Sequence, residues 1–211
     1  MSDVDFYAHV ATLGDVLGAG IGTQPAAWET RLGSDFLDIE DGSLLRRDYG
    51  LVELSFQEED GAWPCFGVSV QVHRLRWDTE SSVPAALRGT YGTFAPSARF
   101  EDLAAAITGL GCSVEPEPDE DGTSGGMHRY RVPESGVRIF VRAEEHAPQQ
   151  AEVWSLSVSP AWWRAAGGAS PPRATAGHTG NAVRRARCSH SSSSVASGDA
   201  SCPRTRATSV R

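Results

Sequence analysis

Residues 44–57 of the chain read Leu-Leu-Arg-Arg-Asp-Tyr-Gly-Leu-Val-Glu-Leu-Ser-Phe-Gln, and this stretch decides the fold class. Residues 44–49 are expected to be extended. Residues 52–57 alternate between apolar and polar side chains, which is the period of a strand with one buried face. Residues 58–61 supply a turn, after which residues 68–73 alternate in the same way. The pattern predicts an antiparallel hairpin with a well-specified register, because a slip of one residue would expose the apolar side chains.

Apolar side chains at helical spacing predict two amphipathic helices and a shorter helix between them. The first helix covers residues 3–17, and its buried stripe is expected to contain Phe6, Val10, Leu13 and Leu17. The short helix lies between Thr23 and Gly33 and buries Trp28 and Leu32. The last helix, which Ser97 can cap, is expected to bury Phe100, Leu103, Ile107 and Leu110.

The ordered part of the chain divides into two similar halves, residues 1–80 and residues 81–164, each with a helix and a β-hairpin. Further strands of the second half are expected at residues 112–115, 128–132, 137–142 and 152–158. The apolar positions recur between the halves, as Val52-x-Leu54-x-Phe56 against Val137-x-Ile139-x-Val141 and Val68-x-Val70-x-Val72 against Trp154-x-Leu156-x-Val158. This match indicates either a duplication or the ordinary likeness of alternating strands. In both cases we expect an α+β fold, with helices packed on one face of an antiparallel sheet.

Charge is distributed unevenly along the chain. Residues 1–164 contain 12 Arg and 26 acidic residues, a net charge of −14, whereas residues 165–211 contain 7 Arg and 1 acidic residue, a net charge of +6. Residues 165–211 have no Leu, Ile, Phe, Trp, Tyr or Met, so they cannot bury enough apolar surface to offset the entropy lost on ordering. We expect this tail to be disordered. It is either the product of a shifted reading frame, a solvated low-complexity extension or a binding tail that uses the arginines at 184–187.

Composition excludes several classes of protein. Apolar runs are far shorter than the ~20 residues that span a bilayer, so no contact with a membrane is expected. The first residues lack the basic start and apolar core of a secretory signal, which indicates a cytoplasmic protein. The acidic charge of residues 1–164 disfavours nucleic acid as a partner, because phosphate binding depends on cationic side chains. The oligomeric state is not determined by these features.

No catalytic motif of a known type is present, and we expect no cofactor and no metal. Asp48 and Glu53 are the nearest approach to a carboxylate pair. Residues five apart in a strand point to opposite faces, so the pair is not expected to converge. The alternative to a non-enzymatic protein is a small enzyme of unknown reaction that uses His73 with Asp48 or Glu53.

Acidic turns and exposed tryptophans are the candidate contacts for a basic protein partner, because complementary charge accelerates association and Trp often anchors an interface. The candidate residues are Glu58, Glu59, Asp60, Trp63, Trp77, Asp119, Glu120, Asp121, Glu144 and Glu145. The alternative interpretation is that these charged residues simply lie in solvated surface loops and bind no partner.

Trp28, Leu32-Gly33, residues 45–56 and residues 70–75 together resemble a pattern in small actinobacterial α+β proteins. In that pattern a helix ends in Leu-Gly, and a Tyr-Gly-x-x-Glu-x-x-Phe-like strand begins a hairpin. Some of these proteins look like immunity proteins of toxin systems, and the pattern carries no catalytic residues. The resemblance implies a cytoplasmic protein that binds and inhibits a basic toxin domain. A housekeeping interaction module is the alternative.

Overall fold

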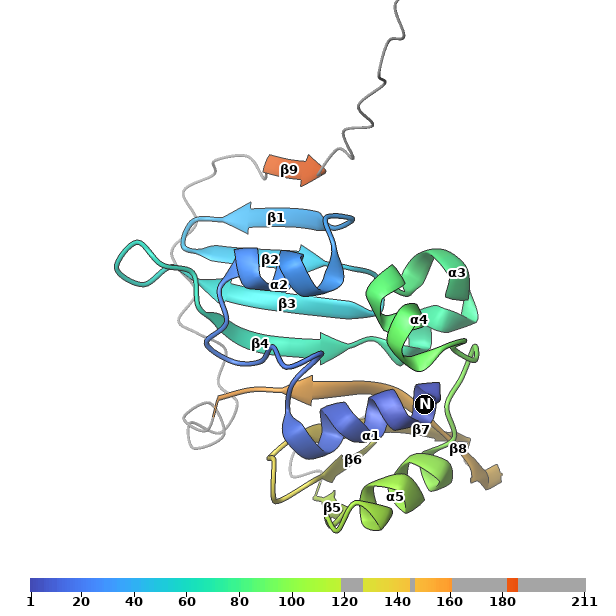
Figure 1. The fold of residues 1–211 in the computed structure, drawn as a ribbon. Coiled ribbons are helices and arrows are strands. Elements are labelled where there is room, and N and C mark those ends of the chain that lie inside the picture. The colour runs from blue at the N-terminus through green and yellow to red at the C-terminus, as the bar shows by residue number, and fades with distance from the viewer. Residues whose placement is uncertain (119–126, 145–146, 161–181, 186–211) are drawn as a thin grey trace, which may run out of the picture.

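The computed structural model describes residues 1–118, 127–144, 147–160 and 182–185. These residues form a continuous antiparallel sheet with strand order β5-β6-β7-β8-β4-β3-β2-β1-β9 (Figure 1). The strands are β1 (Leu37–Asp41), β2 (Leu44–Asp48), β3 (Val52–Gln57), β4 (Cys65–Val70), β5 (Glu115–Glu117), β6 (Met127–Arg131), β7 (Arg138–Glu144), β8 (Ala147–Val158) and β9 (Ala182–Arg185). The predicted antiparallel sheet is therefore confirmed, although the pattern did not predict β1.

The helices pack on one face of this sheet, which confirms the α+β class (Figure 1). In the described part of the chain they are α1 (Asp3–Leu13), α2 (Pro25–Leu32), η1 (Val72–Arg76, a 3-10 helix), α3 (Thr79–Ser82), α4 (Ala85–Tyr91) and α5 (Phe100–Gly109). We call the side that carries α1, α2, α4 and α5 the helical face, and the other side the open face.

Local signals explain where α1 begins and ends. Ser2 and Asp5 form a capping box at its start, each side chain accepting a hydrogen bond from the other residue's backbone N–H. Gly14 ends the helix at a φ of 71°, a left-handed conformation that favours glycine. The helix is therefore shorter than the predicted residues 3–17. Leu13, predicted to be buried, has 63% of its surface exposed.

The end of α5 differs from its prediction in the same way. Leu103 and Ile107 are buried as expected. Leu110 follows the last helical residue, Gly109, as the C-cap and is 61% exposed. The predicted stripe is thus correct in the middle of the helix and wrong at its end.

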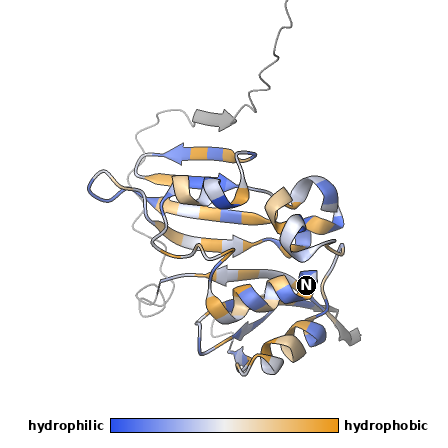
Figure 2. Ribbon diagram, viewed as in Figure 1, coloured by the Kyte–Doolittle hydropathy of each residue, from blue (hydrophilic) through white to orange (hydrophobic). Residues whose placement is uncertain are grey.

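The hairpin of β3 and β4 follows the alternation in the sequence (Figure 2). Val52, Leu54 and Phe56 are fully buried on the helical face, and the intervening residues are only half-buried. The second strand ends earlier than residue 73. β4 stops at Val70, and the chain winds into η1, so the expected strand position of His73 was wrong.

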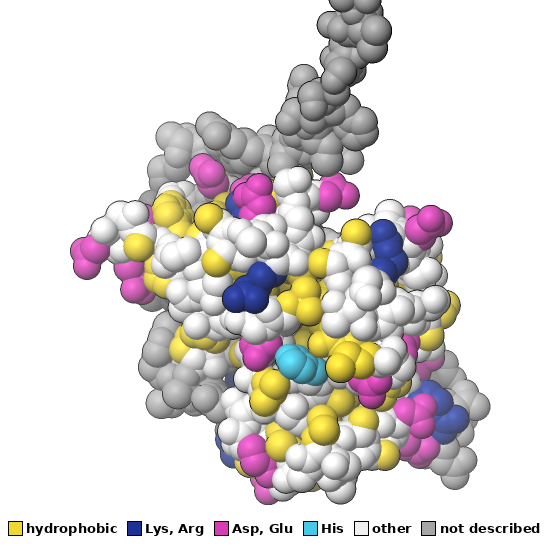
Figure 3. Space-filling model, in the orientation of Figure 1, with side chains coloured by type: hydrophobic (Ala, Val, Ile, Leu, Met, Phe, Trp, Pro, Cys, Tyr) yellow, Lys and Arg dark blue, Asp and Glu magenta, His cyan; other side chains and the backbone are white. Residues whose placement is uncertain are grey.

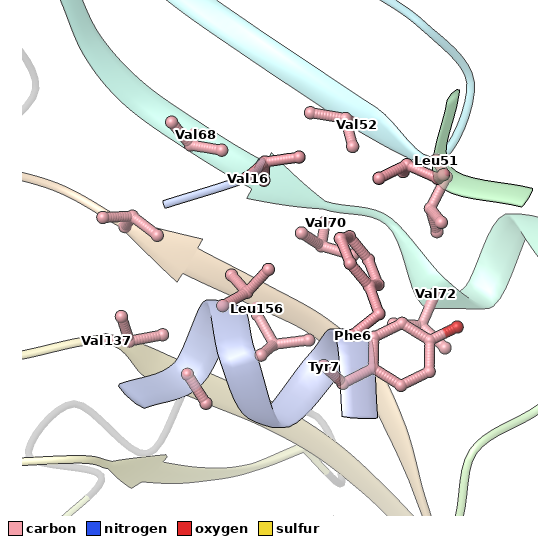
Figure 4. Close-up of a cluster of buried hydrophobic side chains, with 14 of the residues drawn as sticks. Phe6, Tyr7, Val16, Leu51, Val52, Val68, Val70, Val72, Val137 and Leu156 are labelled. Carbon is pink, nitrogen blue, oxygen red and sulfur yellow. The ribbon is translucent and has the colours of Figure 1, made fainter. Parts of the chain in front are cut away.

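The two halves of the chain meet where β4 pairs with β8. The repeat proposed from the sequence matches β3 with β7 and β4 with β8, and these strands lie at corresponding places on either side of that junction. On the helical face, side chains from α1 and from both halves form a single apolar core. Figure 4 shows Phe6 and Tyr7 of α1 beside Val70 of β4 and Leu156 of β8.

The predicted disordered tail, residues 165–211, lies outside the described residues except for β9. That short strand pairs with β1, with Ile39 opposite Val183. The disorder of the tail remains a prediction.

Replacing Leu54 with Ala tests the assigned register of β3. Leu54 has no exposed surface, so Leu54→Ala should lower the free energy of unfolding by about 2–4 kcal/mol through lost burial and a cavity. Urea unfolding measures the change. Ser55→Ala is the matched control, since Ser55 faces the opposite side and should change stability by less than about 0.5 kcal/mol. Equal losses in the two variants would contradict the assigned register.

Candidate functional site

Asp48 and Glu53 converge on one arginine at the end of the β2–β3 hairpin. They lie directly opposite each other in the register, so their side chains share the open face. Arg74 of η1 donates from Nη1 to Asp48 Oδ1 at 2.8 Å and from Nη2 to Glu53 Oε2 at 2.9 Å. The expectation that the two carboxylates would point apart was wrong, because a turn separates them and they do not belong to one strand.

Gly50 makes this convergence possible. Its φ is 86°, and its N–H donates to Asp48 Oδ1 at 2.8 Å while its carbonyl accepts from Arg74 Nη1 at 2.8 Å. A Cβ at this position would lie 2.4 Å from the carbonyl oxygen of Ser82. The turn therefore needs glycine for its left-handed backbone and for the close approach of the chain that enters α4.

Replacing Gly50 with Ala should destabilise the protein by more than about 2 kcal/mol, because left-handed strain adds to a backbone clash. Gly42→Ala is the matched control. Gly42 also has a positive φ, of 60°, but a Cβ there would meet nothing within 4 Å, so only about 1–2 kcal/mol of strain is expected. Thermal and urea unfolding of both variants measure the difference in stability. Equal losses of stability would contradict a clash between the new Cβ and the Ser82 carbonyl.

His73 stacks on Trp154 beside the arginine cluster. The two rings are 4.4 Å apart and nearly parallel, and His73 Nδ1 lies 3.3 Å from the Trp154 carbonyl oxygen. Trp154 is the extra residue where the β7–β8 register shifts, so the bulge turns its ring out of the regular ladder. Arg142 and Arg76 lie over the indole, at 5.6 and 5.8 Å from its centre.

The electrostatic environment favours the neutral form of His73. Burial lowers the pKa of His73, the hydrogen bond with Trp154 partly opposes this, and the positive charges of Arg74 and Arg76 lower the pKa further. Asp48 accepts hydrogen bonds from Arg74 and from the Gly50 N–H, and Glu53 accepts one from Arg74. The arrangement is a cation–aromatic stack beside an ion-pair cluster, in which Arg74 donates to both carboxylates.

Stability should therefore fall as the pH drops through the range in which free histidine titrates. The pKa of His73 is lower in the folded chain than in the unfolded chain. As the pH falls below about 6.5, the unfolded chain therefore binds more protons at this residue than the folded chain does, and unfolding is favoured. His73→Gln should reduce the loss of unfolding free energy between about pH 7.5 and about pH 5.5. The exposed residue His128 supplies the control His128→Gln. The same pH dependence in His73→Gln and the native protein would show that His73 does not couple folding to protons.

Arg47 is a further buried polar group that has a structural partner. Arg47, only 6% exposed, donates from Nε and Nη2 to the two carboxylate oxygens of Asp38, both at 2.8 Å. Burial tends to lower the pKa of Arg47, but its hydrogen bonds with Asp38 and the charge of Asp38 overcome this and raise it. Burial also raises the pKa of the Cys65 thiol to about 12, so that thiol stays protonated.

The predicted contact residues that the structure describes before residue 80 do not form one surface. Glu58, Glu59 and Asp60 are exposed in the loop before β4, and Trp63 of the same loop is half-buried, with its backbone N–H donating to Gln24 Oε1. Trp77 follows η1, beyond the other end of β4, and is 88% exposed. The first acidic turn and the exposed tryptophan are thus separated by the length of a strand (Figure 1).

The remaining predicted contacts lie largely outside the described residues. The structure does not describe residues 119–126 or 145–146, and these ranges include Asp119, Glu120, Asp121 and Glu145. Glu144 ends β7, where its backbone pairs with Ala147. Sequence reasoning missed Arg74 as the common partner of the two carboxylates and Trp154 as the partner of His73. The Arg-x-Arg spacing that follows residue 73 was the available signal for a cationic cluster.

Comparisons with protein-family models, curated proteins and solved structures find no match to this chain. Within the described residues, no helix is long and apolar enough to cross a membrane. The described side chains also include no group of three or more His, Cys, Asp or Glu placed to hold a metal ion.

Proposed function

We propose that the protein is a non-enzymatic binding protein of the immunity type, which neutralises a basic toxin domain by covering it. The observation that carries this proposal is the excess of acidic charge, −14 over residues 1–164. Such a surface attracts a basic protein over long range and accelerates their association. The loose resemblance to immunity proteins at residues 28–75 supports the same class of function.

The distribution of ion pairs supports this proposal. Several arginines of the sheet are engaged by carboxylates, as in the pairs Arg47–Asp38, Arg74–Asp48 and Arg138–Glu117. These arginines therefore do little to offset the exposed acidic residues of the loops, such as Glu58, Glu59 and Asp60. A basic partner would meet a surface whose long-range field is negative.

The test is to co-express the chain with each basic domain encoded beside its gene, and to measure both binding and rescue of growth. We expect one such domain to be toxic alone, to be neutralised by the chain, and to bind more weakly as NaCl rises from about 50 to about 300 mM. If no neighbouring domain is toxic, or if none binds the chain, the proposal fails.

The acidic loop before β4 gives a finer test in the same complex. Neutralising Glu58, Glu59 and Asp60 together, as E58Q/E59Q/D60N, should slow association several-fold, because the loop is exposed and contributes three charges. E101Q/D102N on α5 is the control, since it removes two exposed charges outside the predicted contacts. Surface plasmon resonance gives the rates. Equal slowing in both variants would mean that net charge matters and the loop does not.

A further inference from the structure

Two leucines that helical periodicity assigns to buried stripes are exposed on the same side of the molecule. Leu13 ends α1 and is 63% exposed, and Leu110 follows α5 and is 61% exposed. Both line a groove of about 610 Å³ between α1, the end of α4 and the end of α5. Figure 3 shows hydrophobic side chains gathered over α1 and α5 on the helical face. This volume lies within the range of ~300–1,000 Å³ that is typical of binding sites.

The polar lining of this groove includes one carboxylate, that of Asp5. Asp5 of α1 lines the groove with His9 and Tyr91, and His9 Nε2 lies 3.0 Å from Asp15 Oδ1. Burial raises the pKa of Tyr91, and the negative charges of Asp15 and Asp5 raise it further. Asp15 therefore adds negative charge near this wall, although it does not line the groove. Among the described residues, none that lines the groove is an arginine.

Two arginines in the second half of the sheet lie on the other face. Arg131 and Arg138 are paired opposite each other in β6 and β7, and Arg138 pairs with Ser157 of β8. Ser157 alternates with the buried Leu156, so this row of side chains is on the open face. Arg131 and Arg138 therefore lie on the open face, where Glu117 already engages Arg138, whereas the groove lies on the helical face.

We propose that the groove between α1 and α5 is the docking site for a cationic amphipathic segment of a protein partner. An apolar side chain would contact Leu13 and Leu110, and a neighbouring Lys or Arg side chain would meet Asp5, with Asp15 adding negative charge nearby. For the identity of the partner, this inference rests on the proposed function.

Two other occupants fit the groove less well. Residues 165–211 of the chain are basic, but they contain no Leu, Ile, Phe, Trp, Tyr or Met to fill an apolar groove. A second copy of the chain would bring the same carboxylates of Asp5 and Asp15 to the interface, and like charges oppose association. A basic partner with an apolar anchor satisfies both properties of the groove.

A synthetic peptide tests this site without knowledge of the natural partner. The probe is a fluorescein-labelled helix of about four turns with Leu on one face and Arg on the other, compared with a peptide in which Ser replaces every Leu. Binding to the full chain is measured by fluorescence anisotropy. We expect the Leu peptide to bind at least about tenfold more tightly than the Ser peptide. L13S/L110S should abolish this difference.

Trp77→Ser is the matched control, because Trp77 is also a large exposed apolar residue but lies outside the groove. It should leave the preference for the Leu peptide intact. Circular dichroism melting checks that L13S/L110S folds, as expected for exposed positions. Equal binding of the two peptides, or an unchanged preference in L13S/L110S, would overturn the inference.

The outcome is separable from that of the proposed function. If the Leu peptide uses the groove but no neighbouring basic domain binds, the docking site stands and the immunity function fails. If a neighbouring domain is neutralised but W77S weakens its binding and L13S/L110S does not, the function stands and the groove is not its site. Size-exclusion chromatography completes the test, because a dimer that L13S/L110S dissociates would assign the groove to a second copy.

Discussion

The rest of the structure depends on the apolar packing that holds β4 against β8, where the first four strands meet the next four. The paired residues in this ladder are few, Val68 with Val158, Ser69 with Ser157 and Val70 with Leu156. A ladder of this length needs support from buried side chains, since hydrophobic burial supplies most of the stability of a sheet that packs against helices. Helix α1 supplies it, because its apolar side chains cover the junction on the helical face. Ser135 of the second half also donates to the carbonyl of Ala11 in α1.

The predictable part of the fold was the set of residues that lie within a regularly alternating strand. Leu54 alternates with polar neighbours, and both its strand and its burial follow from that pattern. The convergence of Asp48 and Glu53 was missed because strand alternation holds only within one strand, and the turn at Gly50 begins a new one. Leu13 was wrongly predicted to be buried for a related reason. Periodicity gives the face of the helix on which a residue lies, but it does not show whether another part of the protein covers that face.

For the candidate site, the sequence predicted an excess of acidic residues but not which charged residues pair with each other. Composition shows the acidic excess, but pairing is a property of the fold, and the sequence did not indicate that Arg74 would bind two carboxylates. Trp154 meets His73 because one extra residue interrupts the β7–β8 ladder, and such a bulge leaves no mark in a hydropathy pattern. The acidic turn is separated from Trp77 because β4 lies between them, and the strand predicted at residues 68–73 already contained this signal.

The buried thiol of Cys65 gives the central strand a built-in chemical reporter. Cys65 begins β4, is 1% exposed and has a pKa near 12, so in the closed structure it is neither accessible nor ionised. Thiol reagents attack the thiolate, and they can reach this sulfur only when the strand detaches from its neighbours. The rate at which Cys65 is alkylated in the native protein therefore measures how often the middle of the sheet opens. The same reaction would show whether a bound partner holds the two halves together.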